Sequence, residues 1–489
     1  MWHALTGVED SGGMQMSIAR HRPHDGSAGR LPPRRQLLSR LRRRAALATA
    51  LTLAFTPLAA CGSDLFLGDD SGGGGETTLT WYINPDPTTE ANLGQSGIAQ
   101  RCSEESDEYD IDVQLLPQSA TEQRIQLARR LAAEDNTIDL MSLDPVFVAE
   151  FADAGFLAPI PADMQAEFSD GVLQGAIEGA TWNGELVSAP LWANTQVLWF
   201  RKSMAEAAGF TYTSTPAEPG VLLNQDQQPV TWADIIDAAS EQGGTVGVQA
   251  NKYEGYVVWI NALIEGAGGQ IVSDTEAGAD ATVDIGSEAG MQAAEVVRKL
   301  ADSPAAEPDL SVSNEGTVLG PFADPGGFMV NWTFAFANYN TPEFKDTFED
   351  MGWARYPRTI SEEESAPPIG GIDIGIGAYS DDPDLAMEAA ACITSLENQI
   401  QYAIDTGNMP ANEEAYAAPE LTEAFPADLL ALYRDSIDTA GPRPPTPYWS
   451  SIVLGVLNQW HPADSVNPQT TPQDSAAFIQ NVLDGKSLV

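Results

Sequence analysis

The hydrophobic pattern after residue 78 alternates between short apolar runs and longer segments of helical spacing. Strand-like runs, rich in aromatic and β-branched residues or alternating with polar ones, occupy residues 79–83, 111–115 and 138–143. Segments of helical spacing occupy residues 89–105 and 121–134. This order predicts an α/β protein whose parallel strands are joined by right-handed crossovers.

The same alternation continues to the end of the chain. In the helix expected over 121–134, the apolar stripe consists of Ile125, Ala128, Leu131 and Ala132. We expect further strands over residues 186–200, 328–332 and 369–378, helices over 231–242 and 256–265, an irregular break over 319–327 and a Pro-rich crossing over 441–447. The glycines of 369–378 indicate a hinge strand that another stretch of backbone approaches closely.

Polar residues follow the first and third predicted strands. Asn84 and Asp86 come directly after residues 79–83, and Asp144 comes directly after 138–143. In open parallel sheets, ligands bind beyond the carboxyl ends of the strands. These three side chains are therefore predicted to lie along one edge of the sheet, at a ligand site.

The N-terminal segment has the pattern of a signal peptide, predicted over residues 1–60. These residues carry nine arginines, six of them between Arg34 and Arg44, directly before an apolar run over 45–60. A charged segment followed by a short apolar segment is typical of a secretory signal. The pair Arg34-Arg35 also fits twin-arginine export, so the export route stays open.

The end of the apolar run predicts a lipid anchor. Leu58-Ala59-Ala60-Cys61 resembles the sequence at which bacterial lipoproteins are cut and acylated. Cys61 is therefore the predicted lipidated residue, and residues 61–78, with four consecutive glycines, are predicted as a flexible linker. Acylation would hold the protein at the outer face of the cytoplasmic membrane.

The net charge of the chain narrows the range of molecules that it is expected to bind. Without residues 1–60, the chain keeps 15 basic and 67 acidic side chains, a net charge of about −52. A surface this acidic repels nucleic acid and anionic lipid. We therefore expect no nucleic-acid partner and no membrane contact except through the lipid anchor.

The few cysteines and histidines of the chain bear on whether it contains a disulfide or a metal site. Besides Cys61 the chain has Cys102 and Cys392, an even number in an oxidising compartment. A long-range disulfide between them is predicted, and two buried thiols are the alternative. His461 is the single histidine outside the signal peptide, which disfavours a histidine-rich metal site or a serine–histidine relay. We expect no metal and no cofactor.

Motifs give little support to an enzyme. The sequence contains no GxSxG, HExxH, Walker or CxxC motif. Paired carboxylates of the glycosidase type are abundant, but chance pairs are certain among 67 acidic residues. We therefore expect no catalysis, and a lipid-anchored glycoside hydrolase remains the alternative of a different class.

Aromatic residues beside polar ones suggest carbohydrate binding instead. One face of a sugar ring stacks on an indole, while its hydroxyls need carboxylates, amides or a guanidinium. Three places combine these groups: Trp332 after Asn331, Trp192 before Asn194, and Arg443 before Tyr448-Trp449.

Three stretches carry a resemblance to a known family: residues 116–131, Asp-Leu-Met-Ser-Leu-Asp (139–144) with the segment 149–155, and Tyr-Glu-Gly-Tyr-Val-Val-Trp (253–259). They resemble the mycobacterial trehalose-binding lipoproteins, within the extracellular solute-binding family 1 that includes maltose-binding protein. The resemblance extends from about residue 79 to residue 485. It implies a two-lobe periplasmic-binding-protein-like α/β fold, with hinge strands and a central cleft that closes on the sugar.

The resemblance also implies where the lobes and the sugar contacts lie. Lobe one would comprise 79–188 plus 373–441, and lobe two 192–370 plus 446–489, which places both paired cysteines in lobe one. The implied sugar contacts are Asn84, Asp144, Asn194, Glu315, Trp332, Gly370, Gly371 and Arg443. At Trp192 this chain departs from the smaller polar residues of the family, which reshapes one sugar subsite.

These features together predict a monomeric, lipid-anchored, extracytoplasmic solute-binding protein of an ABC importer. It would bind a disaccharide, trehalose first, and deliver it to the transmembrane subunits of the permease. Maltose or another oligosaccharide is the alternative ligand, and a surface adhesion or sensing protein without a permease is a weaker one.

Overall fold

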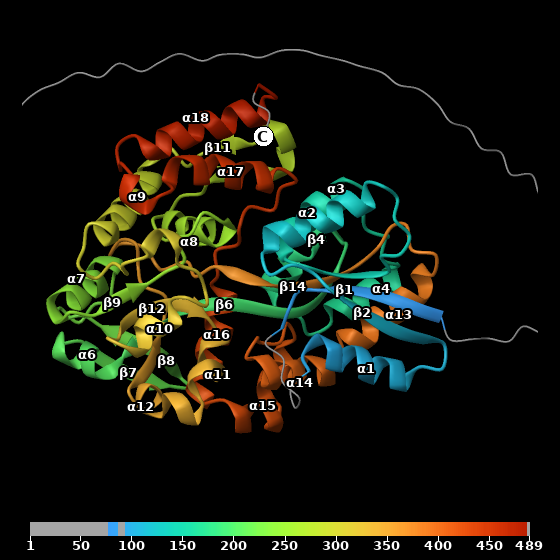
Figure 1. Ribbon diagram of the computed structural model, residues 1–489, viewed down its shortest axis with the longest axis horizontal. Coiled ribbons are helices and arrows are strands. Elements are labelled where there is room, and N and C mark those ends of the chain that lie inside the picture. Colours follow the sequence, from blue (N-terminus) through green and yellow to red (C-terminus); the bar gives the residue numbers. More distant parts are fainter. Residues whose placement is uncertain (1–76, 87–92, 487–489) are drawn as a thin grey trace, which may run out of the picture. The chain divides into compact units, whose positions relative to one another are not determined.

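A long strand, β6 (Ala189–Arg201), joins the two halves of the main sheet in the computed structural model (Figure 1). The structure describes residues 77–86 and 93–486, all within one unit of the chain, residues 72–489. The predicted signal peptide, Cys61 and most of the linker lie outside the described residues.

Besides β6, the strands are β1 (Thr77–Ile83), β2 (Tyr109–Leu115), β3 (Leu140–Leu143), β4 (Thr181–Trp182), β5 (Glu185–Leu186), β7 (Thr211–Thr215), β8 (Glu218–Leu223), β9 (Thr245–Gly247), β10 (Val272–Ser273), β11 (Thr282–Val283), β12 (Gly327–Trp332), β13 (Met351–Ala354) and β14 (Ile369–Ile376). The main sheet has the order β2-β1-β3-β14-β6-β12-β9, with β13 also paired with β6. As predicted, β1 pairs in parallel with both β2 and β3.

Pairing along β6 changes halfway. Residues 189–195 pair antiparallel with β14, and residues 196–201 pair antiparallel with β12 and β13. One half of the sheet, with β1, β2, β3 and β14, is the centre of the first lobe, and the other half, with β9, β12 and β13, is the centre of the second lobe. The predicted two-lobe α/β fold is therefore confirmed, while the predicted residue boundaries of the lobes stay a prediction.

Helices cover both halves of the sheet. They are α1 (Gln95–Glu105), α2 (Ala120–Leu131), α3 (Pro145–Asp153), α4 (Ala162–Ser169), α5 (Gln174–Gly179), α6 (Lys202–Ala207), α7 (Trp232–Gln242), α8 (Glu254–Glu265), α9 (Glu288–Ala301), α10 (Leu319–Ala323), α11 (Ala335–Tyr339), α12 (Lys345–Glu349), α13 (Pro383–Ile393), α14 (Leu396–Thr406), α15 (Pro419–Ala424), α16 (Ala427–Asp438), α17 (Trp449–Trp460) and α18 (Thr471–Leu483). In the first lobe, α2 and α3 lie on one face of the sheet and α1 and α13 on the other (Figure 1).

Local sequence explains why α7 begins and ends where it does. Thr231 caps its first turn by accepting a hydrogen bond from the Asp234 backbone N–H, and the Asp234 carboxylate accepts one from the Thr231 backbone N–H. At the other end Gly243 adopts the left-handed conformation, with φ of 73°. The apolar residues of α7, among them Trp232 and Ile235, are buried in the core of the second lobe.

The structure corrects two local predictions. On α2 the predicted Leu131 is buried and Ala128 packs against the core, but Ala132 is exposed, and Gln123 and Leu127 are buried instead, so the predicted stripe was only partly correct. The buried Gln123 is tolerated because its amide donates to the Pro117 carbonyl at 2.8 Å. The expected irregular break over 319–327 is also corrected, because it contains helix α10. Pro321 is compatible with this helix because it lies in the first turn, where the backbone N–H has no partner within the helix.

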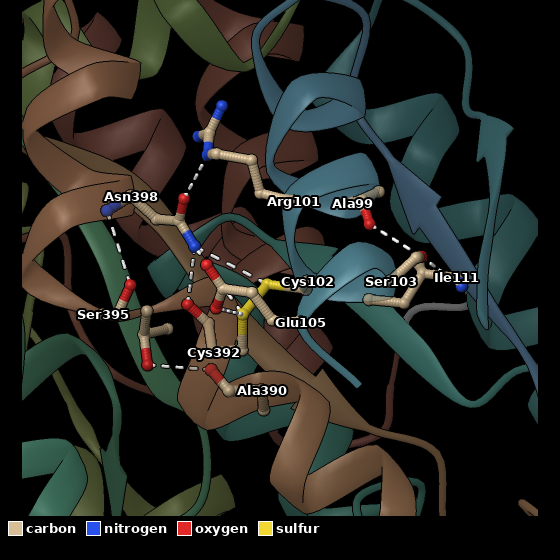
Figure 2. Close-up of a disulfide and its surroundings, with 11 residues drawn as sticks. Ala99, Arg101, Cys102, Ser103, Glu105, Ile111, Ala390, Cys392, Ser395 and Asn398 are labelled. Carbon is tan, nitrogen blue, oxygen red and sulfur yellow. Dashed lines mark hydrogen bonds between the residues drawn. A yellow bond between two sulfur atoms is a disulfide. The ribbon is translucent and has the colours of Figure 1, made fainter. Parts of the chain in front are cut away.

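The structure contains the predicted disulfide between Cys102 of α1 and Cys392 of α13 (Figure 2). Cys102 is fully buried among the apolar side chains of the first lobe. Asn398 Nδ2 donates to the Cys392 carbonyl at 2.8 Å, and Arg101 Nε donates to Asn398 Oδ1 at 2.7 Å. These contacts fix the ends of three helices around the bridge.

The Pro-rich crossing over 441–447 is extended and packs against a buried carboxyl group. Gly441 donates to the Pro367 carbonyl at 2.8 Å, and a Cβ at this position would lie 1.6 Å from Glu265 Oε2. A larger residue at this position would have to displace the Glu265 carboxyl group. Burial raises the pKa of Glu265 to about 8, although Asn261 partly offsets the shift.

This pKa predicts a pH-dependent stability. A carboxyl group whose pKa is higher in the folded state stabilises folding most at low pH, and the contribution is lost between its unfolded value of 4.5 and about 8. Replacement of Glu265 by glutamine should therefore raise the melting temperature by several degrees at pH 8 and by much less at pH 5. Differential scanning calorimetry at both pH values would measure this. Glu362→Gln, at an exposed position, controls for the loss of one negative charge, and equal shifts in both variants would contradict the prediction.

Candidate ligand-binding site

All eight residues predicted to contact a sugar line one cavity of about 290 Å³ between the lobes. Asn84 and Asp144 come from the first lobe, and Glu315 and Trp332 come from the second. Asn194, Gly370, Gly371 and Arg443 come from the three segments that cross between the lobes. The structure thus brings the set together, while the role of each residue in binding stays a prediction.

The strand ends position the first-lobe residues as expected. Asp144 follows β3 and caps α3, where its Oδ1 accepts from the Val146 backbone N–H at 3.2 Å. Asn84 follows β1 and accepts at its side-chain oxygen from Gln95 Nε2 at 3.1 Å. Asp86, the third predicted strand-end residue, does not line the cavity; it accepts from the Gln95 backbone and from Tyr402.

Arg443 forms the centre of an ion-pair network between the lobes. Its Nη2 donates to Asp144 Oδ1 at 2.6 Å, and its Nη1 donates to Glu254 Oε1 at 3.0 Å. Asp144 belongs to the first lobe and Glu254 begins α8 of the second, so one guanidinium connects both. The Arg443 side chain is 3% exposed, which makes these bonds strong in a site of low dielectric.

Glu254 is fixed by more than the arginine. Its Oε1 also accepts from Trp449 Nε1 at 3.3 Å. Burial raises the pKa of Glu254, and the positive charge of Arg443 opposes that shift. The guanidinium is hydrogen-bonded to the carboxylates of both Asp144 and Glu254. Neither carboxylate is therefore placed as the free acid or base that glycoside hydrolysis requires.

Trp332, Gly370 and Gly371 line the cavity together. The Trp332 ring packs beside Gly370, where a Cβ would come within 3.0 Å of the indole. Gly371 has φ of 149°, and a Cβ there would lie 2.2 Å from the Trp192 carbonyl oxygen. Gly371 therefore needs glycine for close backbone approach, as the predicted hinge strand suggested, whereas a larger residue at Gly370 would require the indole to shift.

Two further groups shape the wall of the cavity. Burial raises the pKa of Glu315, and burial together with the nearby Glu315 carboxylate raises the pKa of Tyr253. Asn194 is already hydrogen-bonded, since its Oδ1 accepts from Thr333 Oγ1 at 2.7 Å and its Nδ2 donates to Asn408 at 3.0 Å. A ligand could therefore meet only the remaining hydrogen-bonding capacity of Asn194.

Several residues that line the cavity were not predicted as contacts. They include Tyr253, Glu254, Asn408 and, at or just before the start of α2, Gln118, Ser119, Thr121 and Gln123. Tyr253 and Glu254 lie in a stretch that carries the family resemblance, so the signal was present but gave no role. Asn408 follows Gly407 at the end of α14 and has no pattern of its own.

The described residues contain no group of three or more His, Cys, Asp or Glu side chains placed to hold a metal ion. In the part of the chain that the structure describes, no helix is both long and apolar enough to span a bilayer.

A two-lobe α/β body with a polar and aromatic cavity between its lobes is typical of a ligand-binding protein. Residues 98–427 match the family described as bacterial extracellular solute-binding protein. Because this match spans more than half of the chain, the protein belongs to that family.

The individual relatives described next have low sequence identity to this chain. A probable ABC transporter-binding protein of Deinococcus radiodurans is 22% identical over 315 residues, which cover 61% of this chain and 68% of the relative. Maltose-bound MalE3 of T. maritima has a TM-score of 0.69 at 23% identity and covers 84% of this chain and 99% of its own. The GacH receptor of Streptomyces glaucescens, solved unliganded and with acarbose, has a TM-score of 0.64 at 20% identity, with coverage of 84% and 98%. These structures share the fold.

Proposed function

We propose that this protein captures an α-linked disaccharide, trehalose first, outside the cell and delivers it to the permease of an ABC importer. One observation carries this proposal: eight residues selected from the sequence, spread from position 84 to position 443, line a single cavity. The cavity combines an indole, carboxylates, amides and a guanidinium, which are the groups that recognise sugars.

The relatives support the ligand class. Structures of the same fold were solved with maltose, with acarbose and with maltotetraose. Trehalose rather than maltose rests on the stretches that resemble the mycobacterial trehalose-binding lipoproteins. Maltose remains the second candidate, because Trp192 lines the cavity where that family has a smaller residue.

The proposed location is the outer face of the cytoplasmic membrane. Cys61 would carry the lipid, and residues 61–78 would give the folded body freedom to reach the permease. We propose that the protein acts as a monomer and performs no chemistry on its ligand. Transport specificity then follows from ligand binding, which shifts the population toward the closed form.

Titration calorimetry tests the proposal. The chain from Glu76 to its end is titrated with trehalose, maltose, sucrose and glucose, and Trp332→Ala serves as the site control. We expect saturable trehalose binding that Trp332→Ala weakens at least tenfold, because the stacking platform is lost. Tighter binding of another sugar would transfer the proposal to that sugar, and no binding of any sugar would overturn it.

A further inference from the structure

The charged side chains of the sugar cavity do not balance one another. Among the described residues that line it, Asp144, Glu254 and Glu315 carry carboxyl groups, whereas Arg443 is the single basic side chain. The guanidinium of Arg443 forms ion pairs with Asp144 and with Glu254. Glu315 forms no ion pair with any described basic side chain, so it is the carboxyl group of the cavity that lacks a counter-charge.

Glu315 lies in a poorly solvated place. Burial raises the pKa of its carboxyl group, and its own backbone N–H and the nearby Tyr253 hydroxyl oppose that shift. A positive charge close to such a group favours its ionised form and offsets the cost of removing it from water. A cationic group of a ligand would therefore gain affinity at this point of the cavity.

A buried amide fixes Glu315 relative to the aromatic platform of the cavity. Asn331 Nδ2 donates to the Glu315 carbonyl oxygen at 2.9 Å, and Asn331 Oδ1 accepts from the Trp332 backbone N–H at 2.9 Å. Asn331 is fully buried, and Gln249 Nε2 donates to the same Oδ1 at 3.4 Å. One side chain thus connects the segment that carries the carboxyl group with the end of β12, which carries the indole.

The indole of Trp332 is available to a ligand. Trp332 is only partly buried, lies outside the hydrophobic clusters, and has neither an aromatic partner nor an indole hydrogen bond among the described residues. The rings of Trp192, Tyr253 and Phe334 also line the cavity. Aromatic faces attract an ammonium group, and a carboxylate forms a charge-assisted hydrogen bond with it. The cavity therefore holds both kinds of group that recognise an amine.

The charge of the whole chain acts in the same direction. Without residues 1–60 the chain has 15 basic and 67 acidic side chains. The field of such a surface raises the local concentration of cationic solutes and lowers that of anionic ones. Because the one guanidinium of the cavity is already paired, a phosphorylated or carboxylated sugar would find no free basic partner among the described lining residues.

We propose that the preferred ligand is an amino sugar, an α-linked disaccharide in which a protonated amine replaces one hydroxyl group, pairs with Glu315 and lies against the Trp332 ring. This inference rests on the proposed function, because the same cavity binds the same type of disaccharide. It goes further in naming a charged ligand class and in assigning the recognition of the amine to Glu315.

The test compares amino sugars with their neutral parents by titration calorimetry on the full chain, in a detergent without a sugar headgroup. The ligands are trehalose and maltose, forms of each with an amine in place of one hydroxyl group at C2 or C6, and the N-acetyl derivatives of these amines. At about pH 6.5, where such amines are largely protonated, we expect at least one amine to bind about tenfold more tightly than its parent. Acetylation should abolish this gain, because it removes the charge.

Two variants assign the gain to its cause. Glu315→Gln keeps the shape of the side chain and removes its charge, so the affinity ratio of amine to parent should fall to about one, whatever the affinity for the parent becomes. Glu362→Gln removes one negative charge at an exposed position and should keep the ratio of the wild type. Melting temperatures of both variants, measured alongside, verify that they are folded.

The outcomes separate this inference from the proposed function. Equal affinity for the parents and for all their amines, or a gain that persists in Glu315→Gln, would overturn the inference and leave the proposed function intact. Binding of an amine alone, without binding of its parent, would support the inference. Failure of every sugar, charged or neutral, to bind the wild type would overturn the proposed function and the inference with it.

Discussion

Replacement of Arg443 by methionine should weaken sugar binding about 100-fold and also destabilise the fold. The guanidinium contacts Asp144 at 2.6 Å and Glu254 at 3.0 Å, and its side chain is 3% exposed. Its removal deletes a charged donor in the cavity, a loss on the order of 2–3 kcal/mol. It also leaves the buried Glu254 carboxylate unpaired, at a cost of about 3–5 kcal/mol in stability.

A double variant separates these two effects. Arg443→Met combined with Glu254→Gln removes both buried charges, so most of the lost stability should return. Sugar binding should not return, because the donor is still absent. Calorimetric titration and thermal unfolding of the two single variants and the double variant complete the cycle. Wild-type affinity in the double variant would show that Arg443 acts only through Glu254 and does not contact the sugar.

The sequence could predict that distant residues meet at one site, because the pattern of strand ends and the family resemblance selected some of the same residues. Asp144 was selected by its place after a buried strand as well as by the family resemblance, and it lines the cavity. Strand ends are readable from sequence because the two-residue period and the following turn residues are local properties. Arg443 was likewise selected twice, by its place before Tyr448-Trp449 and by the resemblance, whereas Gly370 came from the resemblance alone, since no local pattern shows which strands meet.

The missed features depend on contacts between distant segments. Glu254 is an ordinary first-turn acid on α8 in sequence, and its role appears only when Arg443, 189 positions later, lies beside it. The buried face of α2 was predicted only in part, because a buried polar residue, Gln123, counts against burial in any hydrophobic pattern.

Removal of the disulfide should lower the free energy of unfolding by about 2–5 kcal/mol. The bridge joins residues 290 positions apart, and a closed loop of that length corresponds to about 6 kcal/mol in the chain-entropy relation, an upper value. Cys102→Ala with Cys392→Ala should therefore melt about 2 to 6 °C lower, given the unfolding entropy of a body of this size. Differential scanning calorimetry in oxidising buffer measures this, and the wild type in reductant provides the matched control.

The loss should be confined to the first lobe, because the bridge connects its two chain segments. Cys102 lies on α1 near the start of the described chain and Cys392 on α13, which follows β14. The bridge therefore closes the first lobe across the inserted second lobe. Hydrogen exchange in the double alanine variant should accelerate in α1, β2 and α13 and stay unchanged in α8 and α9. Neither cysteine lines a cavity, so sugar affinity at temperatures below unfolding should match the wild type. Equal acceleration in both lobes would mean that they unfold as one unit, and the disulfide would then stabilise the whole hinge rather than one lobe.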